Sequence, residues 1–247
     1  MLGFILAGGE GTRFRPITYY IQKCMVPIGM NQKPLLEYIL LNFKKHGIRD
    51  VVIGVGYKAE QIINYFGDGS RIGLKIRYVH DDPNLRGTGG SLLNAYMKDL
   101  LGNSGDLLIH YGDILSAMDL SDLIAKHRRS SADVTIVLAP SYELPVGVAE
   151  VDEEGRIKAF REKPKINIYV SIGILIMKIQ LIREFIKLAE KNQTLDIMSH
   201  FIPYLIESNR NVRAYIYDSF WYDVGSIEKY EKLDHQTIEK YFSELLD

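Results

Sequence analysis

Apolar residues in the first half of the chain form short continuous runs that alternate with segments of helical spacing. The runs predict buried strands at Leu2–Leu6, Val51–Val55, Leu74–Val79, Leu107–His110 and Val134–Leu138. The helically spaced segments predict helices at Leu35–Lys45, Ala59–Phe66, Ser91–Leu101 and Leu120–His127. This order of strands and helices predicts an α/β fold, in which helices cover both faces of a doubly wound, mostly parallel sheet.

The second half of the chain is less regular. Gly147–Val151 and Arg156–Phe160 predict a hairpin, because the polar turn Asp152–Gly155 separates two short extended segments. A long strand is expected after it at Tyr169–Met177. Helices are expected at Leu181–Ala189, Ile197–Glu207 and Ile227–Tyr241. No change in composition marks a second domain, so we expect one domain over residues 1–247.

Composition narrows the class of protein. The chain has 247 residues, of which 47% are hydrophobic and 25% charged, with a formal net charge of -1. This balance is typical of a globular domain, and it argues against a nucleic-acid partner, which is normally met by basic patches. The single cysteine, Cys24, excludes an internal disulfide and fits a reducing compartment. The N-terminal apolar run is too short to span a membrane and lacks a basic start, so we expect a cytoplasmic protein without a membrane partner.

The segment Ala7–Arg13 follows the first predicted strand and carries three glycines. Ligands of open α/β sheets bind at the carboxyl ends of the strands, and glycines let the backbone approach phosphate closely. Arg13 adds a planar guanidinium that can bind phosphate oxygens. These features predict a phosphate site, and the alternative is a tight turn without a ligand.

Two common phosphate loops do not fit this segment. The dinucleotide pattern G-x-G-x-x-G would start at Gly9 but requires glycine where Phe14 stands. The P-loop pattern requires G-K-(S/T), which occurs nowhere in the chain. An oxidoreductase of the dinucleotide-binding class is therefore disfavoured.

Leu6–Thr18, LAGGEGTRFRPIT, is similar to the L-A-(A/G)-G-x-G-T-R-L-x-P-L-T signature of sugar-1-phosphate nucleotidyltransferases. Further segments resemble this family in the expected order: Lys23–Leu40, Arg86–Ala95, Tyr111–Leu115, Gly147–Pro164 and Trp221–Tyr230. The resemblance implies a Rossmann-like nucleotide-diphospho-sugar transferase fold with a mixed, mostly parallel sheet. It also implies the catalytic domain alone, without the hexapeptide-repeat acyltransferase domain of some relatives. Whether the chain forms a homo-oligomer stays open.

The resemblance implies that a sugar 1-phosphate attacks the α-phosphorus of a nucleoside triphosphate and releases pyrophosphate. Both reactants are anionic, so the protein must mainly neutralise charge and position the reacting atoms. Arg13 and Lys23 are the expected phosphate-binding catalytic residues, with Arg15 as an alternative that could equally form a plain salt bridge. The resemblance assigns the nucleotide to Leu6, Ala7, Gly8, Gly9, Gly11, Thr12, Arg13, Gly87 and Thr88.

Two aspartates are expected to hold Mg²⁺, which prefers oxygen ligands. Asp113 follows a buried strand and is expected to serve catalysis through the metal. Asp223, in the segment Trp221–Gly225, corresponds to the family's usual second metal ligand. For either aspartate the alternative is an ordinary turn or capping residue.

On the sugar side, the resemblance assigns Gly147, Glu162, Lys163 and Ser171. Two departures from the family pattern concern this side. Val146 replaces the usual tyrosine before Gly147, and Ser171 replaces an asparagine that contacts sugar hydroxyls. These departures leave room for an unusual sugar, or for another acceptor such as phosphocholine. In a third departure, Cys24 replaces the proline after Lys23, where we expect only a local change in packing.

The base is expected to be read by the loop before Gly87. Guanine presents two adjacent donors, to which a carboxylate is a bidentate acceptor, and Asp82, or Asp81, is the candidate. The G-T-G-G sequence from Gly87 resembles that of mannose- and heptose-1-phosphate guanylyltransferases, and this resemblance favours GTP and a mannose-type sugar 1-phosphate. The alternatives are UTP or dTTP with glucose or N-acetylglucosamine 1-phosphate. A non-catalytic homologue is disfavoured because Arg13, Lys23 and both aspartates are present.

Overall fold

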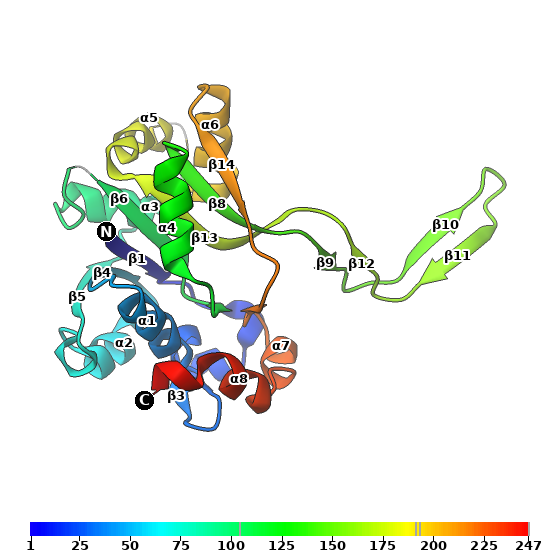
Figure 1. Ribbon diagram of the computed structural model, residues 1–247, viewed down its shortest axis with the longest axis horizontal. Coiled ribbons are helices and arrows are strands. Elements are labelled where there is room, and N and C mark those ends of the chain that lie inside the picture. The colour runs from blue at the N-terminus through cyan, green and yellow to red at the C-terminus, as the bar shows by residue number, and fades with distance from the viewer. Residues whose placement is uncertain (104, 191, 193, 247) are drawn as a thin grey trace.

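The computed structural model describes residues 1–103, 105–190, 192 and 194–246. Its centre is a seven-stranded sheet in the order β14-β8-β13-β6-β1-β4-β5 (Figure 1). The strands are β14 (Val212–Ile216), β8 (Val134–Ala139), β13 (Val170–Lys178), β6 (Asp106–Tyr111), β1 (Leu2–Ala7), β4 (Asp50–Val55) and β5 (Lys75–His80). Only β13 runs antiparallel to its neighbours in this sheet. The predicted α/β fold with a mixed, mostly parallel sheet is confirmed.

Helices cover both faces of the sheet (Figure 1). The helices are α1 (Leu35–Lys45), α2 (Ala59–Phe66), α3 (Gly87–Met97), α4 (Leu120–Arg129), α5 (Glu184–Ala189), α6 (Ile202–Glu207), α7 (Ile227–Glu231) and α8 (His235–Leu246). α1, α2 and α4 share one apolar cluster with the sheet, and α3, α5 and α6 share another. Successive strand residues point to opposite faces, so Ile5 lies in the first cluster and Phe4 in the second.

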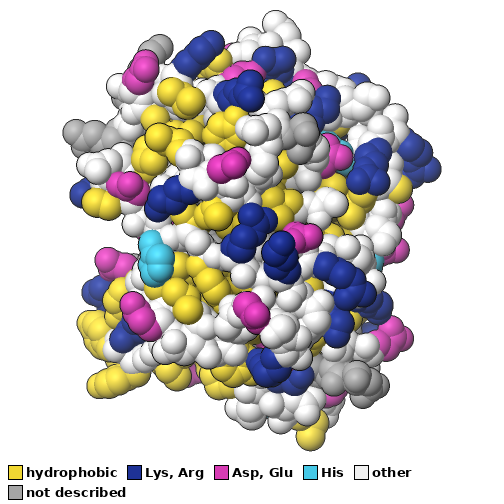
Figure 2. Space-filling model, turned by 90° about the vertical axis from the view of Figure 1, so that its left-hand side faces the viewer, with side chains coloured by type: hydrophobic (Ala, Val, Ile, Leu, Met, Phe, Trp, Pro, Cys, Tyr) yellow, Lys and Arg dark blue, Asp and Glu magenta, His cyan; other side chains and the backbone are white. Residues whose placement is uncertain are grey.

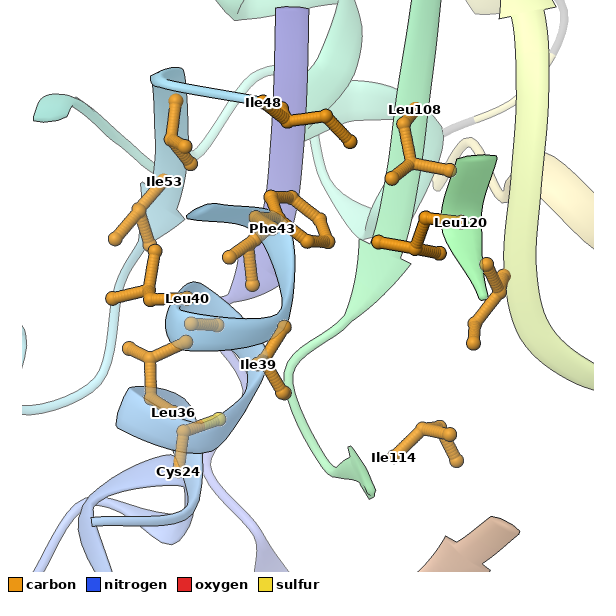
Figure 3. Close-up of a cluster of buried hydrophobic side chains, with 14 of the residues drawn as sticks. Cys24, Leu36, Ile39, Leu40, Phe43, Ile48, Ile53, Leu108, Ile114 and Leu120 are labelled. Atoms are coloured by element: carbon orange, nitrogen blue, oxygen red, sulfur yellow. The ribbon is translucent and has the colours of Figure 1, made fainter. Parts of the chain in front are cut away.

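The first cluster fixes α1 against β1 (Figure 3). Leu36, Leu40 and Phe43 point from α1 toward the sheet at helical spacing. A β-carbon at Gly3 would come within 2.6 Å of the Phe43 ring, so glycine is needed there for the ring to pack on the strand. This packing holds β1 in place, and β1 leads into the segment Ala7–Arg13, the glycine-rich loop.

A third apolar cluster ties the C-terminus to the segment after that loop. Phe14, Val26 and Ile28 are buried together with Ile238 and Phe242 of α8. The C-terminal helix therefore supports the chain that carries Lys23, although more than 200 residues separate them in the sequence.

Several predicted boundaries were wrong. α3 begins at Gly87 and not at Ser91, because the backbone N–H groups of Gly89 and Gly90 bond to the Leu195 carbonyl, at 2.9 and 3.3 Å. Glycine is a poor helix former, which hid this first turn in the sequence. The last helix is divided into α7 and α8, where Asp234 accepts from the Thr237 N–H at 2.9 Å and starts a new helix.

Short strand pairs complete the fold. They are β2 (Pro27–Ile28) with β3 (Lys33–Pro34), β7 (Ile114–Ser116) with β15 (Trp221–Asp223), β9 (Tyr142–Glu143) with β12 (Lys165–Ile166), and β10 (Val148–Val151) with β11 (Ile157–Arg161). The β10–β11 pair confirms the predicted hairpin. The other three short pairs and β14 were not predicted. In the central sheet, β13 is the expected long strand, and it has a bulge between Ser171 and Leu175.

Residues 142–169 form an arm that stands clear of the body (Figure 1). β9 and β12 make its neck, and β10 and β11 make its blade. The face of the body turned away from the arm carries acidic and basic side chains intermingled (Figure 2). Within the described residues, no helix has the length and apolar character needed to cross a membrane.

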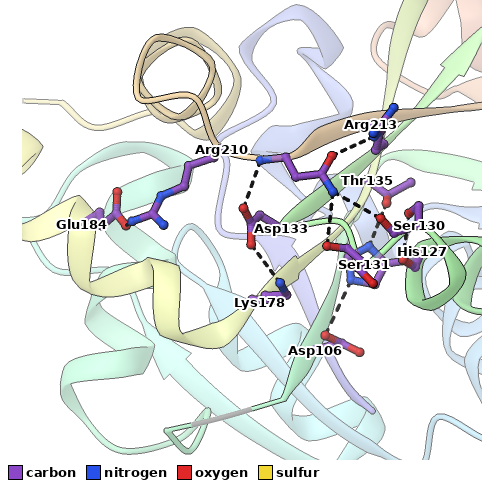
Figure 4. Close-up of polar contacts among 11 residues, drawn as sticks. Asp106, His127, Ser130, Ser131, Asp133, Thr135, Lys178, Glu184, Arg210 and Arg213 are labelled. Atoms are coloured by element: carbon purple, nitrogen blue, oxygen red, sulfur yellow. Dashed lines mark hydrogen bonds and ion pairs between the residues drawn. The ribbon is translucent and has the colours of Figure 1, made fainter.

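A polar network joins three strands at their ends opposite the glycine-rich loop (Figure 4). Asp133, just before β8, accepts from Lys178 Nζ of β13 at 2.8 Å and from the Asn211 N–H before β14 at 3.0 Å. Partial burial by itself would raise the pKa of Asp133, but these donors outweigh it and hold the pKa below its ordinary value of 3.8. The ionised carboxylate therefore stabilises the folded state.

Replacing Asp133 by alanine should lower the free energy of unfolding by about 1–3 kcal/mol, because two donors lose their acceptor. The depressed pKa means that this contribution is present above pH 3.8 and is lost as the pH falls through the folded pKa. Urea denaturation from about pH 7 downward measures it, and the gap between wild type and variant should shrink below pH 3.8. Asp218→Ala, at an exposed aspartate, is the control. An Asp133→Ala variant as stable as this control would contradict the assignment.

Candidate active site

A cleft of about 330 Å³ opens where β1 and β6 end. It is lined by Leu6, Ala7, Gly8, Gly9, Gly11, Gln22, Lys23, Cys24, Asp81, Gly87, Thr88, Ser91, Tyr111 and Asp113. Nine of the residues predicted for the nucleotide and for catalysis are in this set. The structure therefore brings together the glycine-rich loop, the turn Lys23–Met25 (the lysine turn), the start of α3 and the end of β6.

Backbone hydrogen bonds hold the glycine-rich loop between the neighbouring strands. The Tyr57 N–H donates to the Gly8 carbonyl at 3.0 Å, and the Gly112 N–H donates to the Leu6 carbonyl at 2.9 Å. A β-carbon at Gly8 would lie 2.2 Å from Asp81 Oδ2, so a side chain there would displace the Asp81 carboxylate. A β-carbon at Gly9 would meet no protein atom within 4 Å, so the backbone there is open to the cleft.

Gln22 joins this loop to the lysine turn. Its side chain is buried, and Nε2 donates to the Ala7 carbonyl at 2.7 Å. Its Oε1 accepts from the Cys24 N–H at 2.5 Å, and its own N–H donates to Gln61 Oε1 at 2.7 Å. Sequence reasoning missed Gln22, because one polar residue before a lysine gives no sign that it is buried.

Lys23 and Asp113 meet at the floor of the cleft. Lys23 Nζ lies 2.5 Å from Asp113 Oδ2, and the two side chains are 11% and 26% exposed. Lys23 comes from the turn that Gln22 fixes, and Asp113 follows β6. This pair thus places a cation and a carboxylate within reach of a ligand on the glycine-rich loop.

The N-terminus of α3 forms another wall. The Leu195 carbonyl accepts from the third and fourth N–H groups of the helix, those of Gly89 and Gly90. The Thr88 hydroxyl is engaged away from the cleft, since it donates to Asp196 Oδ2 at 2.7 Å and accepts from the Ile197 N–H at 2.9 Å. Within the described residues, the first two backbone N–H groups of α3, those of Gly87 and Thr88, are left for the cleft, where they suit an anion.

Cys24 lies beside these groups without a nucleophilic role. Burial raises the pKa of its thiol to about 12, and the nearby Asp113 carboxylate acts in the same direction. The thiol therefore stays protonated at neutral pH. The side chain packs in the first apolar cluster.

Three residues predicted for the nucleotide do not line the cleft. Thr12 and Arg13 are exposed beyond the loop, and Arg13 has no ion pair within the described residues. Asp82 caps a turn, because its Oδ1 accepts from the Asn84 N–H at 2.8 Å. The Asp82 carboxylate is therefore used locally, and of the two candidates for base recognition it is Asp81 that lines the cleft. Arg15, the alternative phosphate ligand, pairs with Glu10 at 3.4 Å.

Asp81 is the carboxylate that the loop places in the cleft. Although the residue reaches solvent through the open cleft, its environment raises the pKa of the carboxyl, because the surrounding chain removes part of its water. A β-carbon at Gly8 or Gly56 would lie 2.2 Å from its Oδ2, so it sits directly against the glycine-rich loop. No ion pair neutralises Asp81 within the described part of the chain.

The backbones of Asp223 and Asp113 lie side by side, but the two residues line different cavities. β15 pairs with β7, and the Val224 N–H donates to the Asp113 carbonyl at 2.9 Å. The Asp223 carboxylate pairs with Lys229 Nζ at 2.5 Å. It lines a cavity of about 460 Å³ between the neck of the arm and α7, together with Lys163 and Trp221.

The residues predicted for the sugar lie on or near the arm. Gly147 and Glu162 face each other there, since a β-carbon at Gly147 would lie 2.9 Å from Glu162 Oε2. Lys163 is at the neck, and Ser171 is exposed at the bulge of β13. None of these four residues lines the cleft that holds the glycine-rich loop.

The chain matches the model of the nucleotidyl transferase family over residues 2–240 and belongs to that family. It is 32% identical over 256 residues to the UTP–glucose-1-phosphate uridylyltransferase of Synechocystis sp. strain PCC 6803, covering 93% of this chain and 61% of that protein. It is also 32% identical over 231 residues to the mannose-1-phosphate guanylyltransferase of Mycobacterium tuberculosis, covering 92% of this chain and 61% of that protein.

A solved structure shows the same fold. A Bacillus anthracis protein described as a glucose-1-phosphate thymidylyltransferase has a TM-score of 0.77 and 22% identity, covering 96% of this chain and 95% of that one. The predicted nucleotide-diphospho-sugar transferase fold is thereby confirmed. The chain spans about three fifths of the length of the two curated relatives, at 61% of each.

Replacing Gly9 by alanine tests whether a phosphate approaches the loop. The new methyl group meets no protein atom within 4 Å, so the fold should keep its melting temperature. It would occupy space that a bound phosphate needs, so affinity for a nucleoside triphosphate should fall about tenfold or more. Isothermal titration calorimetry measures the affinity, and thermal unfolding of the ligand-free protein is the control. Unchanged affinity in a stable variant would contradict close approach at Gly9.

Proposed function

We propose that this chain transfers a nucleotidyl group from a nucleoside triphosphate to a sugar 1-phosphate, giving a nucleotide sugar and pyrophosphate. The observation that carries the proposal is the Lys23–Asp113 pair, at 2.5 Å, beneath the glycine-rich loop in a cleft of suitable size. Membership of the nucleotidyl transferase family supports it, as do the names of both curated relatives.

Different groups in and around the cleft can bind different parts of the phosphates. Open backbone at Gly9 and the first turn of α3 can receive phosphate oxygens. Lys23 Nζ can leave Asp113 for a phosphate oxygen and neutralise charge that develops at the reacting phosphorus. Arg13 is exposed and unpaired within the described residues, so it can swing toward the outer phosphates. No protein nucleophile is required, which fits the protonated thiol of Cys24.

Asp113 and Asp223 fit a magnesium ion in part. Their backbones are joined by a hydrogen bond of 2.9 Å, and each carboxylate already faces a cation, a lysine ammonium 2.5 Å away. No cluster of three or more metal-binding side chains occurs among the described residues, so waters and phosphate oxygens would complete the shell. When bound, Mg²⁺ would neutralise phosphate charge and help to align the reactants. Lys23 and Lys229 would then be released toward the substrates.

Asp113→Asn tests the proposal directly. Losing the carboxylate should lower kcat by about 100-fold or more, because the Mg²⁺ that would neutralise and align the phosphates loses a ligand and Lys23 loses the partner that positions it. Pyrophosphate release with Mg²⁺ measures the rate, for each of several nucleoside triphosphates with each of several sugar 1-phosphates. Asp99→Asn, at an exposed aspartate on the surface, is the matched control. Near-normal activity of Asp113→Asn would overturn its role, and a wild type without activity on any pair would overturn the function.

For the base we propose guanine, with a mannose-type sugar 1-phosphate as acceptor. Asp81 lies in the cleft without an ion pair, and its carboxylate can accept from both N1–H and N2–H of guanine. The guanylyltransferase of Mycobacterium tuberculosis supports this choice, whereas the uridylyltransferase of Synechocystis supports UTP with glucose 1-phosphate. Gly147, Glu162, Lys163 and Ser171 remain the proposed contacts to the sugar. The cytoplasmic location likewise stays a prediction.

Adjacent aspartates give a matched test of base recognition. Asp81→Asn should lower the ratio of kcat/KM for GTP to that for UTP by about 10- to 100-fold, because an amide offers one acceptor where guanine needs two. Asp82→Asn should leave the ratio unchanged, since the Asp82 carboxylate caps a turn outside the cleft. A ratio that responds to Asp82 and not to Asp81 would show that the cleft reads the base differently.

A further inference from the structure

The arm, residues 142–169, leaves an unusual share of apolar surface open to solvent. Of the 15 large hydrophobic side chains that are exposed in the described part of the chain, six lie in the arm. They are Val146, Val151, Ile157, Phe160, Ile168 and Tyr169, which are 44% to 67% exposed. The arm makes up only about a ninth of the 247 residues. This concentration marks it as an interaction surface.

The blade also lacks the support that a hairpin normally needs. β10 and β11 pair only with each other, so each has one edge without a partner strand. Figure 1 shows no helix or sheet of the body behind them. An isolated two-stranded hairpin is marginally stable in water, and unpaired edges invite another chain.

Unpaired charges of opposite sign lie at the two ends of the arm. Glu153 and Glu154 are exposed at the tip, and Lys163 and Lys165 are exposed at the neck. None of these four residues forms an ion pair within the described part of the chain. By contrast, Arg161 of the blade is already paired with Glu150 at 2.6 Å.

The tip and the neck of one arm are too far apart to meet. About eight residues separate Pro145 from Glu153, which corresponds to roughly 26 Å at the rise per residue of a strand. A second copy related by a two-fold axis, with its arm antiparallel, brings each acidic tip to the other chain's basic neck. The same arrangement brings the two apolar blades together, since a two-fold interface uses the same surface on both chains.

We propose that the arm is a dimerisation element that pairs with the antiparallel arm of a second copy of this chain. The apolar side chains of the two blades pack together. The acidic tip, Glu153 and Glu154, contacts the basic neck of the other copy at Lys165. The interface supplies the cover that the body does not give, and it requires neither substrate nor activity.

Two exposed isoleucines, one in the arm and one on α6 as the control, test the apolar part of the interface. The wild-type chain should sediment as a dimer, and Ile157→Ser should raise the dimer dissociation constant at least about tenfold. Ile206→Ser is the matched control, because Ile206 is 57% exposed on α6 and Ile157 is 64% exposed on the arm. Sedimentation velocity over a range of protein concentrations measures both variants. A wild type that stays monomeric, or an Ile157→Ser dimer as tight as the control, would overturn the proposal.

A charge exchange tests the antiparallel arrangement. Glu153→Lys alone and Lys165→Glu alone should each weaken the dimer about tenfold, because like charges then face each other. The double variant should return the dissociation constant to the wild-type value, since a basic tip then meets an acidic neck. Both positions are exposed, so the fold should persist, and circular dichroism checks it. A double variant that associates more weakly than either single variant would contradict this contact.

Discussion

The ion pair between Lys23 and Asp113 is the contact on which the site depends. It joins two residues 90 positions apart, one from the turn after the glycine-rich loop and one from the end of β6. A partly buried ion pair gives little net stability, because both charges lose water when they come together. We therefore attribute its presence to function, since it keeps a cation and a carboxylate ready for phosphate. The surrounding structure serves to place these two groups: Gln22 fixes the lysine turn, and the β7–β15 pair brings Asp223 beside Asp113.

Strands and helices that are buried in the body could be predicted from the sequence. Apolar periodicity placed β1, α1, β4 and α2 nearly to the residue, because each buries one face or both in the core. The start of α3 could not be predicted in this way. Its glycines oppose helix formation locally, and only the carbonyl of Leu195, more than 100 residues away, satisfies their N–H groups.

The candidate site was predictable where backbone geometry determines it. The glycine-rich loop, Lys23 and Asp113 meet because the carboxyl ends of β1 and β6 are neighbours. The choice between Asp81 and Asp82 was not, since it depends on which side of one turn each carboxylate takes. The position of Arg13 and of the sugar residues also lay beyond the sequence pattern, because an exposed side chain and an extended arm leave no periodic signal.

The most direct measurement is a crystal structure of the chain with a non-hydrolysable guanosine triphosphate analogue and Mg²⁺. We expect the triphosphate to lie against Gly8, Gly9 and Gly11, and Lys23 Nζ to move from Asp113 to a phosphate oxygen. We also expect the base to lie against Asp81. A nucleotide bound elsewhere, or bound in the cleft with the Lys23–Asp113 pair unchanged at 2.5 Å, would contradict the proposed role of this pair.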